Sequence, residues 1–139
     1  MAHRLLEHVT DAIVEVDSGS LDGAFAEAAT ALAEITLDTS SVEEREERVV
    51  VASGRDVRHA LLDWLEAANL AIITGGFAAR RFGARVEGRG PCEVRGTAHG
   101  EALDTARHGF RVEVKAPTLH MMEVSESPGR VRLRFLLDL

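Results

Sequence analysis

The feature that most constrains the fold is a change in hydrophobic periodicity at Phe77. From this residue to the C-terminus, most segments alternate apolar and polar side chains, which predicts β-strands with one buried face. Before it, segments 21–37 and 57–73 carry apolar side chains at steps of three and four, which is typical of amphipathic helices. We therefore expect an α+β fold: a mostly antiparallel or mixed β-sheet with two amphipathic helices packed on it.

Short polar clusters mark the ends of these elements. Residues 17–20 form a turn that can cap the first helix, 53–56 resemble a capping box for the second helix, and Gly75-Gly76 end it. Trp64 shares the apolar stripe of the second helix, so we expect it in the core. The predicted strands are 5–16 with a break near Thr10-Asp11, 42–52, 77–87, 92–102 with a bulge at Gly96, 110–115, 119–125 and 131–137, with a loop over 104–109.

The composition limits the classes of function. The length of 139 residues predicts a single domain over 1–139. The single cysteine excludes an intrachain disulfide, and no apolar run is long enough for a membrane span or a signal peptide. We therefore expect a cytoplasmic protein with no membrane contact. The net charge of −7 argues against direct, non-specific binding of nucleic acid.

One local run of arginines departs from this acidic balance. Its members are Arg80, Arg81, Arg85, Arg89 and Arg95. We interpret the run as the solvated face of a hairpin, and the alternative is a contact surface for a partner or for RNA.

Segment 110–115 contains the only lysine of the chain. In FRVEVK the apolar and polar residues alternate, which predicts a half-buried strand that Pro117 ends because proline has no amide proton to donate. Glu113 and Lys115 share the polar face. The chain has fifteen arginines but only this one lysine. Either it is what a strong arginine bias leaves behind, or this position requires a compact ammonium where a planar guanidinium does not fit.

Acidic residues near both ends of the chain form a second candidate group. Asp11 lies near the N-terminus and Asp138 is the penultimate residue. The termini of one domain often lie close together, so Asp11, Asp138 and the terminal carboxylate of Leu139 are candidates to converge. Such hard oxygen donors suit a divalent metal ion, calcium or magnesium first and manganese as a further candidate.

Three histidines stand beside these motifs. His8, His108 and His120, together with Glu113, are candidate supporting residues of the same site. Each histidine is also explained as a structural residue that bonds a neighbouring carboxylate or backbone group. We interpret Glu101 and Asp104 as loop or rim residues.

Several separated segments together resemble the archease family. They are EHVTD (7–11), LLDWL (61–65), GEALDTARHGFRVEVKAPTLHMMEV (100–124) and the final Asp-Leu pair. The resemblance covers essentially the whole chain in order and spacing. The departures from the family pattern are Val9-Thr10, Pro117, Leu119 and Leu139, and none of them removes a charged residue.

The resemblance implies an accessory protein and not a free-standing enzyme. Archeases assist RtcB-type RNA ligases, which join RNA ends with GTP and manganese in tRNA splicing or RNA repair. They promote guanylylation of the ligase and its repeated turnover. By motif match, the resemblance implies Asp11 and Asp138 as an acidic metal-binding pair and Lys115 as the residue essential to activation, with RNA contacted only indirectly.

Two other classes of function stay open. A carboxylate-metal hydrolase would use Asp11, Asp138 and a histidine base, and turnover by the purified protein alone would identify it. A chaperone-like scaffold would expose apolar patches and bind unfolded chains without any ligase. The sequence shows no such patch.

Overall fold

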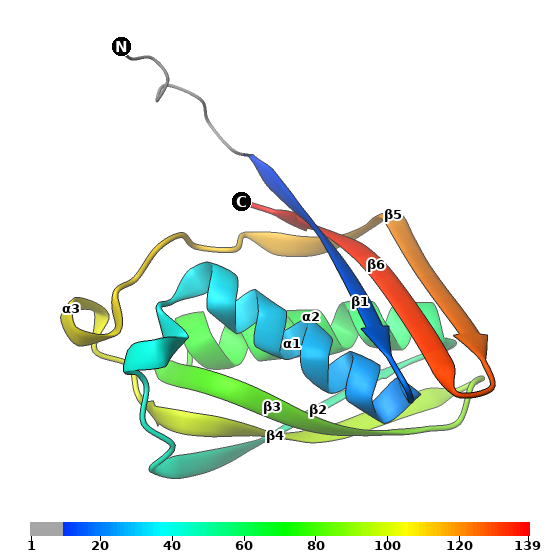
Figure 1. Cartoon of the computed structure of the whole chain (residues 1–139), viewed down its shortest axis with the longest axis horizontal. Helices are drawn as coiled ribbons and strands as arrows, with labels where there is room; N and C mark the ends of the chain where they lie inside the picture. Colours follow the sequence, from blue (N-terminus) through cyan, green and yellow to red (C-terminus); the bar gives the residue numbers. More distant parts are fainter. Residues whose placement is uncertain (1–9) are drawn as a thin grey trace.

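The computed structural model describes residues 10–139 and contains two helices between two β-sheets (Figure 1). The elements in chain order are β1 (Asp11–Ser18), α1 (Leu21–Thr36), a short 3-10 helix η2 (Thr39–Ser41), β2 (Glu46–Gly54), α2 (Val57–Ile73), β3 (Phe77–Glu87), β4 (Cys92–Ala102), α3 (Thr105–His108), β5 (Ala116–Ser127) and β6 (Arg130–Asp138). One sheet has the strand order β1-β6-β5 and the other has the order β2-β4-β3. All strand pairs are antiparallel.

The predicted α+β class with two packed amphipathic helices is confirmed, but the strands divide between two sheets. α1 packs mainly on β3 and also contacts β1, while α2 packs on β2 and β5. Alanines at 24, 29 and 33 are fully buried beside the larger apolar residues of α1. They widen its apolar face, so one helix can cover parts of both sheets. No helix among residues 10–139 has the length and hydropathy needed to cross a membrane.

The helix ends follow local capping chemistry. The Ser20 hydroxyl accepts a hydrogen bond from the Gly23 amide at 3.0 Å and caps α1, as the sequence predicts. The capping box predicted from Ser53 is wrong, because Ser53 belongs to β2 and Asp56 caps α2 by accepting from the His59 amide at 2.8 Å. Beyond the end of α2, the Gly76 backbone adopts a φ of 63°, which glycine tolerates without strain.

Trp64 lies at the centre of the core and is fully buried. Its indole nitrogen donates to the Phe25 carbonyl at 2.8 Å, which joins α2 to α1. Its ring packs edge to face against the ring of Phe82 in β3, with the ring centroids 5.9 Å apart. Aromatic pairs favour this arrangement. The prediction that Trp64 is a core residue is confirmed.

The strand predicted over 110–115 is wrong. This segment crosses between the two sheets as irregular chain, and its backbone groups bond to separate elements. The Arg111 amide donates to Thr36 at the end of α1 at 2.8 Å, and the Val114 carbonyl accepts from the Asn69 side chain of α2 at 2.8 Å. Pro117 does not end a ladder but lies inside β5 opposite Leu137, which is tolerated because β5 is an edge strand.

A strand start, a loop and a bulge also differ from the predictions. β2 begins at Glu46 and not at Val42, because η2 occupies the chain before it. The predicted loop 104–109 contains the single helical turn α3, capped by Asp104. The bulge lies between Ala79 and Arg81 of β3, and the ladder is continuous at Gly96.

Gly96 is required by packing. A Cβ atom there would lie 2.4 Å from the Trp64 ring and 2.3 Å from the Gly83 carbonyl oxygen. We expect Gly96→Ala to lower the free energy of unfolding by about 1–3 kcal/mol, because the added methyl group overpacks the core. Gly83→Ala is the matched control on the neighbouring strand, where a Cβ meets nothing within 4 Å. Urea unfolding of both variants measures the difference, and equal stabilities would contradict this account.

Candidate functional site

The first and last strands place the two candidate aspartates opposite each other. β1 pairs with β6 so that Asp11 faces Asp138 at the end of the ladder. One residue further out, the Leu139 amide donates to the Thr10 carbonyl at 2.8 Å. Asp11 and Asp138 therefore occupy a non-hydrogen-bonded position, where opposing side chains come closest. The two ends of the described chain do meet at the side chains that the sequence singled out.

Lys115 lies beside this pair, immediately before β5. Its backbone amide donates to the Asp138 carbonyl at 2.8 Å, and the next residue, Ala116, is the partner of Asp138 on β5. In Figure 1 the C-terminal end of β6 lies between the start of β1 and the start of β5. We call Asp11, Lys115 and Asp138 the charged tip.

The two aspartates of the charged tip carry like charges at facing positions. Asp11 and Asp138 are both exposed on the outer face of the sheet, and like charges directly opposite on neighbouring strands destabilise each other. The Thr10 hydroxyl donates to Asp11 at 3.2 Å. The ion pairs formed among residues 10–139 include neither aspartate. A cation that contacts both carboxylates would remove this repulsion.

Asp11 and Asp138 carry the hard oxygen donors that divalent ions take, but they supply only two ligands. Within the described part of the chain, no group of three or more His, Cys, Asp and Glu side chains is arranged to hold a metal. Asp11 and Asp138 therefore offer two ligands, and the others would come from water or from a bound partner. Calcium and magnesium accept such mixed oxygen shells.

Three of the four predicted supporting residues lie within residues 10–139, and none of these three bonds to the aspartates of the charged tip. His108 is fully buried at the end of α3, and both of its ring nitrogens have partners there. His120 and Glu113 are exposed, and no hydrogen bond or ion pair between residues 10–139 connects either of them to Asp11 or Asp138. His8 lies outside the described residues.

Comparison with known proteins decides the family. A model of the archease protein family matches residues 3–139. The chain belongs to the archease family. Protein archease of Methanopyrus kandleri is 35% identical over 135 residues, with 96% of each chain covered. Protein archease of Methanothermobacter thermautotrophicus is 36% identical over 120 residues, which cover 86% of this chain and 85% of that protein.

Solved archease structures share the fold. The solution structure of protein 1598 from Methanobacterium thermoautotrophicum has a TM-score of 0.76 and 33% identity, with 96% of this chain and 95% of that chain covered. A crystal structure from Thermotoga maritima, described as "an archease, possible chaperone", has a TM-score of 0.62 and 19% identity, with 96% and 94% covered. At that identity the second comparison supports the fold alone.

This archease chain also contains a buried carboxylate that the sequence did not reveal. Glu101 is 5% exposed and accepts hydrogen bonds from the Arg107 side chain at 2.9 Å and the Glu43 amide at 2.9 Å. The Nδ1 atom of His108 accepts from the Asp104 amide at 3.0 Å, so its Nε2 carries the proton and donates to Glu101 at 3.0 Å. We call Glu101, Arg107 and His108 the Glu101 cluster. Its hydrogen bonds hold α3 and the chain before β2 in place.

A partial signal for this cluster is present in the sequence. Asp104 followed by T-A-R-H has the pattern of a capped helical turn, with His108 four residues after the cap. The alternation of β4, however, assigns Glu101 to the polar outer face. Glu101 is buried only because α3 and residues 43–45 fold over that end of the strand.

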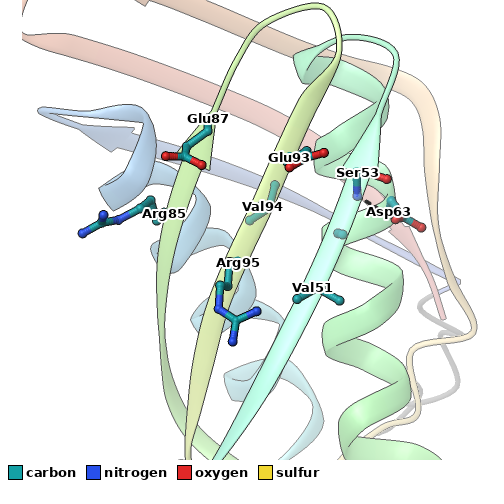
Figure 2. Close-up of a pocket in the computed structure, with 9 residues that line it drawn as sticks. Val51, Ser53, Asp63, Arg85, Glu87, Glu93, Val94 and Arg95 are labelled. Atoms are coloured by element: carbon teal, nitrogen blue, oxygen red, sulfur yellow. Dashed lines mark hydrogen bonds between the residues drawn. The ribbon is translucent and has the colours of Figure 1, made fainter.

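The basic run divides into structural and unpaired arginines. Arg80 donates to the Val42 carbonyl, Arg81 pairs with Glu44, and Arg89 pairs with Glu126. Within residues 10–139, Arg85 and Arg95 form no ion pair or side-chain hydrogen bond, and they face each other across β3 and β4. Figure 2 shows them on the outer face, around a shallow hollow that Glu87, Glu93 and Val51 also line.

The Glu101 cluster makes the free energy of unfolding depend on pH in the acid range. The hydrogen bond from Arg107, followed by those from the Glu43 amide and His108, lowers the pKa of Glu101 from 4.5 to about 2. A depressed folded-state pKa contributes stability that is fully present above pH 4.5 and is lost as the pH falls towards 2. We expect Glu101→Gln to be less stable than the wild type above pH 4.5, and this difference to shrink between pH 4.5 and 2.

Thermal unfolding measured from pH 7 to pH 2 tests this expectation. Glu66→Gln, which neutralises an exposed carboxylate on α2, is the control and should keep the wild-type acid slope. A pH-independent difference between wild type and Glu101→Gln would show that the cluster does not act through the charge of Glu101.

Proposed function

We propose that this chain is an accessory protein that activates an RtcB-type, GTP-dependent RNA ligase in the cytoplasm. In this role it promotes guanylylation of the ligase and repeated turnover in tRNA splicing or RNA repair, and it has no reaction of its own. Membership of the archease family supports the proposal. The observation that carries it is the charged tip, where Asp11 faces Asp138 and the Lys115 amide bonds to Asp138.

The charged tip combines two signs of charge at one exposed end of a sheet. The aspartates would hold the divalent ion, and Lys115 adds a compact ammonium that can approach phosphate oxygens as a point charge. When bound, the metal supplies positive charge to oxygens of a nucleotide or of the ligase site. The chain itself supplies the positions of these charges, because Asp11, Lys115 and Asp138 sit on paired or hydrogen-bonded backbone.

The proposed partner is a protein, and this chain would act on RNA only through that protein. A net charge of −7 repels a phosphate backbone. Three of the five arginines in the basic run are already bound to groups of the chain itself. The exposed carboxylates of Asp11 and Asp138 and the ammonium of Lys115 would instead suit a protein site that contains a metal ion and a nucleotide.

A guanylylation assay with a purified RtcB-type ligase tests the function. We expect Asp138→Asn and Lys115→Ala each to lower the stimulation of ligase guanylylation by at least about tenfold, since each removes one charge of the tip. Lys115→Arg retains the charge but not the compact shape, so its stimulation of the ligase should fall between that of the wild type and that of Lys115→Ala.

Glu15→Gln is the matched control, because Glu15 is an exposed carboxylate on the same face of β1, four residues from Asp11. It should stimulate like the wild type. Full stimulation by Asp138→Asn and Lys115→Ala would refute the proposal. The same preparations without ligase also test the hydrolase hypothesis, which requires turnover of a phosphoester by the archease alone.

Metal binding is a separate expectation. Isothermal titration with Ca²⁺, Mg²⁺ and Mn²⁺ should detect an ion bound by the wild type. Asp11→Asn and Asp138→Asn should each weaken that binding by about tenfold or more, because each removes one of two opposed carboxylates. Glu15→Gln again serves as the control. Equal affinities of the wild type and both variants would place the metal elsewhere.

A further inference from the structure

The outer face of the β1-β6-β5 sheet carries its side chains in rows that start at the charged tip. Both helices lie between the two sheets, so this face is turned away from them (Figure 1). In the row after Asp11 and Asp138, Ile13 of β1 lies opposite Leu136 of β6, and Leu136 lies opposite Thr118 of β5. Side chains of a strand alternate between its two faces, so this row shares the face of the two aspartates. We call Ile13, Leu136 and Thr118 the second row.

Ile13 is the most exposed residue of the second row. It is 56% exposed, whereas Leu136 and Thr118 are half-buried. Ile13 and Leu136 occupy a non-hydrogen-bonded position, as Asp11 and Asp138 do two residues away. Opposing side chains come closest at such positions, so Ile13 and Leu136 form a small apolar surface directly behind the charged tip.

Charged side chains bound this apolar surface on both sides. On one side lie the carboxylates of the charged tip, and on the other Arg134 lies between Glu15 and Glu123. An apolar centre within a polar rim is typical of protein-binding surfaces. Acidic groups outnumber basic ones around it, so two copies of this surface would repel each other and a positively charged partner would suit it. The groups are Asp11, Glu15, Glu123 and Asp138 against Lys115 and Arg134.

The short distance from the charged tip to Ile13 brings both into contact with the same partner. Two residues of an antiparallel strand span about 7 Å. A standard interface buries about 800 Å² on each protein, which is a patch of roughly 15 Å radius. A partner centred on Asp11 and Asp138 therefore also covers Ile13. Glu15 lies about 13 Å from the charged tip, near the rim, where a single exposed charge contributes little.

We propose that Ile13 anchors this chain on its ligase, by packing against an apolar surface beside the metal and nucleotide site of that enzyme. The inference rests on the proposed function and gives the two rows different tasks. The charged tip acts on the groups that change charge during guanylylation, whereas Ile13 adds contact area that is the same before and during that step. The anchor therefore sets how tightly the chain binds the ligase, and the tip sets how far it stimulates the ligase.

Titration of ligase guanylylation with increasing amounts of this chain separates the two tasks. Ile13→Gln should raise the concentration that gives half-maximal stimulation by about tenfold or more, because the burial of one isoleucine side chain is lost. It should leave the maximal rate unchanged, which also shows that the variant is folded. Ile13→Leu keeps the apolar volume and should titrate like the wild type. Asp138→Asn and Lys115→Ala should instead lower the maximal rate.

Val51→Gln is the matched control, because Val51 is 59% exposed on the outer face of the other sheet. It should keep the half-maximal concentration of the wild type. An unchanged value for Ile13→Gln, or equal shifts for Ile13→Gln and Val51→Gln, would overturn the anchor and leave the proposed function standing. A lower maximal rate at an unchanged half-maximal concentration would also overturn the anchor, because Ile13 would then act together with the tip.

Two further outcomes concern the partner itself. A wild type that does not stimulate the ligase at any concentration would overturn the proposed function and the anchor with it. Sedimentation of this chain alone should give a monomer of 15.1 kDa. A dimer that Ile13→Gln dissociates would assign the surface to a second copy of the chain and overturn the proposal.

Discussion

The antiparallel pairing of β1 with β6 is the constraint on which the candidate site depends. It joins the first and last strands of the described chain, and its register puts Asp11 opposite Asp138. A slip of one residue would turn Asp11 towards the core, because side chains of a strand alternate between faces. Val16 on β1 and Leu133, Phe135 and Leu137 on β6 are buried, so the hydrophobic core holds the register that creates the charged tip.

α2 connects this tip to the rest of the molecule. Its Asn69 side chain donates to the Val114 carbonyl, directly before Lys115. Near its start, Arg58 donates to the Leu119 and Met122 carbonyls, where the pairing of β5 with β6 is interrupted. Trp64, halfway along the same helix, is packed against Gly96 of the opposite sheet. One helix therefore fixes both the core and the segment that presents the only lysine.

Periodicity predicted the helices and the long hairpin well, since β3 and β4 have the bounds expected from the sequence. It failed at 110–115, where the alternation of FRVEVK reflects partial burial against different elements and not strand pairing. Local patterns cannot show which distant groups accept a hydrogen bond. For the same reason, the burial of Glu101 depends on residues 43–45 folding over it, far from it in sequence. The meeting of Asp11 with Asp138 was predictable because both lie next to chain ends, whereas the separation of His108 from them was not.

The charged tip is anchored by its main chain. The Lys115 amide, the Asp138 carbonyl and the Leu139 amide make the bonds that hold it, and none of these bonds needs a particular side chain. Substitution at positions 11, 115 or 138 therefore leaves the scaffold intact, and replacing one of two opposed acids would relieve repulsion. The opposed acids therefore contribute nothing to folding that the backbone bonds do not already supply, which is what the proposed role in binding predicts.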